Sequence, residues 1–107
     1  MRTAQENHWR TGEATALFLL GRTLGKEEPP QTEKAEKSIL EGIKVFEELK
    51  IKTHYAPGYY YLGELYAEAG QKDKASETLK KAESLFREME MVYWLAKTQK
   101  ILRSLED

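Results

Sequence analysis

Residues 59–66 read YYYLGELY, and this stretch decides the fold because its central phrase occurs twice. Residues 61–63, YLG, match residues 19–21, LLG. Five small or apolar positions downstream recur 40 residues later: Ala35, Ile39, Gly42, Phe46 and Leu49 are echoed by Ala75, Leu79, Ala82, Phe86 and Met89. Each set has the spacing of one face of a helix. A repeat of this length indicates stacked helical pairs, which usually offer binding surfaces to other proteins.

The segments around the repeat predict an all-α chain. Helix-forming residues dominate, and valine occurs only at Val45 and Val92. We expect five helices, over residues 11–24, 32–49, 54–69, 73–89 and 91–105 of a single domain spanning residues 1–107. Four residues mark the helix ends: Gly25 and Gly70 as stops, Pro57 in the first turn of the third helix, and Asp73 as the cap of the fourth.

Composition excludes several classes of function. Lys and Arg total 17 against 18 Asp and Glu, so the chain lacks the basic surplus of a non-specific nucleic-acid binder. There is no cysteine, which excludes disulfides and thiolate metal sites. The longest apolar runs, residues 16–20 and 91–96, are far shorter than the roughly 20 residues that span a membrane. We expect a cytoplasmic protein without a nucleic-acid or membrane partner.

The helices differ in how much of their surface is apolar. The first and third are apolar in almost every direction, which predicts an inner layer, whereas the second and fourth are amphipathic and predict an outer one. The later part of the last helix is polar, as in a cap. The first helix is not, so its flank needs a cover: upstream repeats of a longer protein, residues 1–10, or a second copy of the chain. The self-association face is expected at Trp9, Leu17, Phe18 and Leu19.

The pattern Tyr59-x-x-Leu62-Gly63-x-x-Tyr66, followed by small residues in the next helix, resembles a tetratricopeptide repeat. The resemblance implies a right-handed α–α superhelix of two long helix-turn-helix repeats plus a C-terminal capping helix. It also implies a concave groove, lined by the inner helices, that receives a peptide or a partner helix. The positions that would face this groove are Phe18, Arg22, Tyr60, Glu64 and Lys97.

Several phrases are similar to the carboxy-terminal repeat region of large bacterial regulators that carry a nucleotide cyclase or kinase domain and an ATPase domain. They include residues 12–14 (GEA), 63–66 (GELY) and 86–95 (FREMEMVYWL). This resemblance implies a fragment of such a regulator and a role in bacterial signalling. Neither catalytic part is present in the 107 residues.

No pattern in the chain predicts catalysis, a metal site or a cofactor. His8 and His54 have no Cys, Asp or Glu at ligand spacing, and the glycines are too scattered for a phosphate loop. Glu64 and Glu68 lie one helical turn apart, which on a repeat helix favours a binding or solvated face over acid–base chemistry. The sequence therefore predicts a scaffold that binds a protein or peptide and is not an enzyme. The alternative is a homo-oligomerisation module that brings attached catalytic domains together.

Overall fold

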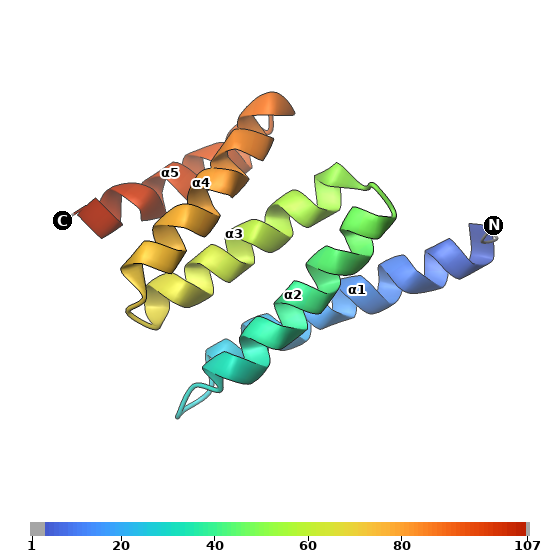
Figure 1. Ribbon diagram of the computed structural model, residues 1–107, viewed down its shortest axis with the longest axis horizontal. Helices are drawn as coiled ribbons and strands as arrows, with labels where there is room; N and C mark the ends of the chain where they lie inside the picture. Colours follow the sequence, from blue (N-terminus) through green and yellow to red (C-terminus); the bar gives the residue numbers. More distant parts are fainter. Residues whose placement is uncertain (1–3, 107) are drawn as a thin grey trace.

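The computed structural model describes residues 4–106, with side chains from Trp9 onward, and this part of the chain is entirely helical apart from short turns (Figure 1). The helices are α1 (Ala4–Gly25), α2 (Thr32–Glu48), α3 (Lys52–Glu68), α4 (Lys72–Glu88) and α5 (Val92–Glu106). No strand occurs in the described range 4–106. The all-α prediction is confirmed.

Three interhelical turns share one backbone geometry and recur every 20 residues. Lys50, Gly70 and Glu90 have positive φ angles of 60°, 78° and 57°. In each turn the next amide donates to the carbonyl five residues earlier at 2.9 Å: Ile51 to Phe46, Gln71 to Tyr66, and Met91 to Phe86. This Schellman pattern satisfies carbonyls that the helix end would leave unpaired. The result is a regular change of direction after α2, α3 and α4.

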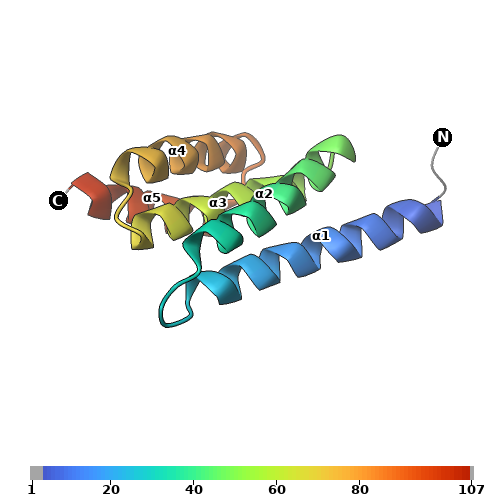
Figure 2. The ribbon, with the colours of Figure 1, turned by 60° about the horizontal axis from the view of Figure 1, so that its bottom comes forward.

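The helices follow one another across the molecule, with α1 and α5 at opposite ends (Figures 1 and 2). Each of α1 and α5 packs against α3, so the three odd-numbered helices are neighbours, and α3 also contacts α2 and α4. In the described chain, α2 and α4 do not contact each other. The hairpins α1–α2 and α3–α4 are therefore joined through α3.

In each hairpin, a glycine of the odd-numbered helix allows the two helices to approach each other closely. A β-carbon added at Gly21 would lie 2.5 Å from Ile39 Cγ1, and one added at Gly63 would lie 2.4 Å from Leu79 Cγ. Such distances are far inside van der Waals contact, so each glycine is what permits the close approach. Four of the five stripe positions of each even-numbered helix are buried: Ala35, Ile39, Gly42 and Phe46 in α2, and Ala75, Leu79, Ala82 and Phe86 in α4. The fifth positions, Leu49 and Met89, follow the helix ends and are half-buried.

The prediction that the first helix starts at residue 11 is wrong, because α1 begins at Ala4. The Arg10 guanidinium pairs with the Glu48 carboxylate at the end of α2. Lys52 Nζ lies 3.0 Å from Glu88 Oε1 in the corresponding position of the second hairpin. Both hairpins thus have a cross-helix ion pair at the same end, and the first requires a helical residue 10.

Two predicted helix signals are also wrong. Pro57 lies in the second turn of α3, which begins at Lys52, so the helical hydrogen bond to the Thr53 carbonyl is absent. Asp73 does not cap α4: the cap position is Gln71, without a side-chain hydrogen bond. The start of α4 is instead fixed by the turn at Gly70.

Candidate binding surface across the inner helices

Aromatic rings run continuously from α1 through α3 to α5. The Phe18 ring centroid lies 5.7 Å from that of Tyr61, and Tyr61 lies 5.9 Å from Tyr60. Tyr60 lies 5.5 Å from Trp94, which in turn lies 6.1 Å from Tyr93. These four pairs meet edge-on, the favourable arrangement for aromatic rings. The odd-numbered helices therefore share one aromatic strip.

Two cations lie on this strip. The Arg22 guanidinium is 4.6 Å from the centre of the Tyr61 ring. Lys97 Nζ lies 5.2 Å from the Tyr60 centre and 5.3 Å from the Tyr93 and Trp94 centres. Within the described residues, neither cation has a carboxylate within ion-pair distance. We call the accessible part of this region the inner surface, made of Arg22, Tyr61, Glu64, Tyr93, Trp94 and Lys97.

The phenols of Tyr60 and Tyr61 stay protonated at neutral pH. Burial raises the pKa of Tyr60, and the nearby Glu64 carboxylate raises it further, while Arg22 opposes both effects. Burial likewise raises the pKa of Tyr61 above its ordinary value, again opposed by Arg22. Both hydroxyls therefore remain neutral hydrogen-bonding groups next to Arg22 and Glu64.

The structure separates the five predicted groove residues into two groups. Arg22 is exposed and Glu64 and Lys97 are half-buried at the inner surface, so their contact with a partner stays a prediction. Phe18 and Tyr60 are only 7% and 4% exposed, so the prediction that they face a partner is wrong.

Packing explains both burials. The Phe18 ring fills the space above two glycines of neighbouring helices: a β-carbon at either Gly42 or Gly58 would lie 2.6 Å from a ring atom. Trp94 and Lys97 of α5 cover Tyr60.

Sequence reasoning predicted Lys97 but missed the two aromatic residues that α5 contributes to the inner surface. Tyr93 is 69% exposed, and Trp94 is half-buried beside it. One signal was available: Tyr93 and Trp94 precede Lys97 by four and three residues, the spacing that places side chains together on a helix. Residues 91–96 were instead interpreted as an apolar run that packs inward in a capping helix.

The flank of α1 carries exposed apolar side chains. Trp9 is 72% exposed, Leu19 65% and Leu20 50%. Trp9 and Leu20 are 11 residues apart, about three turns, and so lie on one line along the helix. Leu17 is half-buried, and the buried Phe18 does not belong to this surface, which corrects the predicted self-association face. Residues 4–10 continue the helix and so do not cover the flank, while residues 1–3 lie outside the described part.

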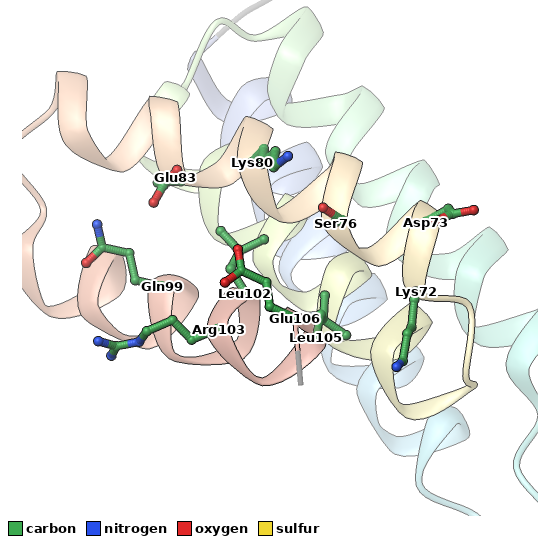
Figure 3. Close-up of a pocket in the computed structure, with 10 residues that line it drawn as sticks. All are labelled: Lys72, Asp73, Ser76, Lys80, Glu83, Gln99, Leu102, Arg103, Leu105 and Glu106. Carbon is green, nitrogen blue, oxygen red and sulfur yellow. The ribbon is translucent and has the colours of Figure 1, made fainter.

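A groove lies between α4 and α5, on residues that the sequence analysis did not select (Figure 3). Its volume is about 700 Å³, and it is open to solvent. Charged and polar side chains surround two leucines in the lining, which consists of Lys72, Asp73, Ser76, Lys80, Glu83, Gln99, Leu102, Arg103, Leu105 and Glu106. We refer to it as the α4–α5 groove.

The described side chains offer no cluster of His, Asp or Glu that could hold a metal ion. His54 is exposed and contacts Thr53, and the His8 side chain lies outside the described part. Glu68 Oε1 lies 3.4 Å from Lys26 Nζ, and both side chains are exposed. Over residues 4–106, no helix is both long enough and apolar enough to cross a membrane.

Comparison with protein-family models, with curated proteins and with solved structures gives no match to this chain. The function is therefore argued from the surfaces described above.

Proposed function

We propose that this chain is a protein-interaction module that binds a peptide or partner helix across the inner surface. The observation that carries the proposal is the aromatic strip shared by α1, α3 and α5, with Arg22 and Lys97 lying on its rings. Tyrosine, tryptophan and arginine are enriched among the few residues that carry most of the binding energy in protein interfaces. The rings of tyrosine and tryptophan are large, rather rigid and partly polar, so these side chains lose little conformational freedom on binding.

The fold supports this proposal by holding the strip rigid. The odd-numbered helices lie side by side, and a glycine-mediated contact fixes each hairpin, at Gly21 in the first and at Gly63 in the second. A rigid concave or flat face built from neighbouring helices suits an extended partner, because the surface does not have to be ordered on binding. We further propose that the chain is a two-repeat tetratricopeptide-like superhelix with α5 as its cap. A cytoplasmic role in bacterial signalling, as part of a larger regulator, rests on the sequence resemblance alone.

The test is selection of binders from a random peptide library, followed by calorimetry with variants of the inner surface. Tyr93→Ser and Glu64→Lys are expected to weaken binding of the selected peptides at least about tenfold, the effect of losing roughly 1.4 kcal/mol. Lys44→Glu, a matched charge change on the exposed face of α2, should leave binding unchanged. Equal affinities for wild type and both inner-surface variants would reject the proposal.

A second candidate function, homo-oligomerisation, is favoured by the exposed flank of α1. Leu20 and Trp9 present apolar area to solvent along one line of the helix. We propose that two copies bury this flank against each other if the inner surface is not the main interface. Sedimentation should then show a dimer for the wild type, a monomer for Leu20→Glu, and a dimer for the control Leu40→Glu on α2. A wild-type protein that stays monomeric at high concentration would eliminate this alternative.

A further inference from the structure

The inner surface carries three charged side chains of alternating sign, one from each odd-numbered helix. Arg22 belongs to α1, Glu64 to α3 and Lys97 to α5. Helix α3 lies between the other two, because α1 and α5 both pack on it and, in the described chain, do not contact each other. The order of charge across the surface is therefore positive, negative, positive.

These charges gather around two neighbouring rings of α3. The Arg22 guanidinium lies 4.6 Å from the Tyr61 ring centre, and Lys97 Nζ lies 5.2 Å from that of Tyr60. Burial raises the pKa of both phenols, and the Glu64 carboxylate raises it further, so Glu64 is close to the same rings. With 5.9 Å between the two ring centres, the path from one cation to the other is about 16 Å long, which an extended peptide covers in about five residues. One short segment can therefore reach all three charges.

One helical turn further along, α1 and α3 close a cross-helix ion pair that the inner surface leaves open. Lys26 Nζ of α1 lies 3.4 Å from Glu68 Oε1 of α3. Arg22 and Glu64, each four residues earlier, form no such pair in the part of the chain that the structure describes. The guanidinium lies on the Tyr61 ring instead. Both charges therefore remain available to a partner.

The third charge, on Lys97, is half-buried among rings. Nζ lies within 5.3 Å of the ring centres of Tyr60, Tyr93 and Trp94. Among the described residues, no carboxylate comes within ion-pair distance of this ammonium group. The rings exclude water from one side of the ammonium group but offer it no strong hydrogen-bond acceptor. A carboxylate of a partner would supply that acceptor, in a place where a charge-assisted hydrogen bond is stronger than in bulk water.

A partner of alternating charge fits this surface better than a partner of one charge. A wholly acidic segment would place a carboxylate against Glu64, and a wholly basic one would place cations against Arg22 and Lys97; like charges in contact oppose binding. A neutral segment would cover all three groups without supplying counter-charges, at a cost in desolvation. The order acidic, basic, acidic gives each of the three groups a partner of opposite sign.

We propose that the inner surface selects a peptide segment in which two acidic side chains flank a basic one within about five residues. The two carboxylates bind Arg22 and Lys97, and the basic side chain binds Glu64. This selectivity rests on the peptide-binding function proposed above and adds which peptides the surface accepts. Charge complementarity of this kind contributes mainly to the choice of partner.

The probe is the tightest peptide from the library selection described above, synthesised with an acetylated amino end and an amidated carboxyl end so that no terminal charge contributes. Its sequence is expected to contain the acidic–basic–acidic order. A permuted peptide, with the basic residue moved outside the two acidic ones, keeps the composition and the net charge. It should bind at least about tenfold more weakly in calorimetry. Equal affinity for the two orders, or selected peptides that shift the Trp94 indole signal but lack this charge order, would overturn the proposal.

Amide replacements assign the contacts without altering the protein. Changing each acidic residue of the peptide to its amide should weaken binding to the wild type at least about threefold, and changing both at least about tenfold. In Lys97→Gln, one of the two replacements should lose its effect, and in Arg22→Gln the other, because the contact is already absent. Lys44→Gln, on the exposed face of α2, should keep the sensitivity of the wild type.

Two kinds of failure are distinguishable in these experiments. Selected peptides that leave the Trp94 indole signal unchanged would reject the peptide-binding function itself, and the selectivity with it. Peptides that shift this signal but bind the wild type equally well with acids or with amides would leave the function standing and refute the charge order alone.

Discussion

Gly63→Ala gives the sharpest test of how the hairpins are built. Alanine is favoured over glycine in a helix by up to about 1 kcal/mol, so the same change in an open position stabilises the protein. Gly12 is such a position, because no atom lies within 4 Å of an added β-carbon. At Gly63 that carbon would lie 2.4 Å from Leu79 Cγ and 2.5 Å from Leu79 Cδ2. Leu79 is fully buried and cannot move away.

Overpacking of this kind costs about 1–3 kcal/mol. Because the propensity gain is common to both sites, the difference between Gly63→Ala and Gly12→Ala isolates the strain. We expect the Gly63 variant to be about 1–3 kcal/mol less stable than the Gly12 variant in urea unfolding followed by circular dichroism. Gly21→Ala, in the equivalent contact with Ile39, should behave like Gly63→Ala. If Gly63→Ala stabilised as much as Gly12→Ala, the hairpin contact described here would be wrong.

Three further predictions concern the tyrosines and the turns. Tyr66→Phe should cost about 1–2 kcal/mol in urea unfolding because the hydrogen bond to Glu36 is lost, and an unchanged midpoint would contradict that bond. Burial and Glu36 raise the pKa of Tyr66 above its ordinary 10.0, so its contribution to stability is complete below pH 10 and is lost as pH rises further; thermal melts should show a weaker alkaline loss in Tyr66→Phe than in the wild type. Lys50→Gly should stabilise by up to about 1 kcal/mol because φ is positive there, whereas Gly70→Ala should destabilise by about 1–2 kcal/mol; equal effects of the two changes on the thermal midpoint would refute the turn geometry.

Helical periodicity was sufficient to predict the elements from α2 to α5 within two residues at each end. The stripe of small and apolar residues in α2 and α4 was also predictable, because a buried helix face has a small or apolar residue at every third or fourth position. The start of α1 was not. The predicted start at residue 11 lies inside the helix, which begins at Ala4 and places Arg10 beside Glu48. Long-range ion pairs of this kind leave no local sequence signal.

The positive φ angles in the turns after α2 and α4 were also not predictable from the residue types. Only Gly70 carries the residue type that a positive φ favours, while Lys50 and Glu90 adopt the same conformation without it. Their 20-residue spacing from Gly70 was the available clue.

Candidate-site residues were harder to predict than helices, because exposure depends on packing between helices. Phe18 and Tyr60 occupy the positions expected to face a groove, yet both are buried by partners distant in sequence. Gly58 makes room for Phe18, and Trp94 covers Tyr60. A single-sequence pattern identifies which residues share a face but not which neighbour covers it. For the same reason, the groove between α4 and α5 was not predictable, because packing of the two helices brings its lining residues together.

The two tryptophans allow the central claim to be tested in one measurement. Trp94 belongs to the inner surface, and Trp9 lies on the flank of α1. The indole N–H signals of both residues can be followed by nuclear magnetic resonance while a library-selected peptide is added. Binding across the inner surface predicts that the Trp94 signal shifts with saturation and that the Trp9 signal stays in place. A peptide that binds while shifting only Trp9, or neither indole, would contradict the account.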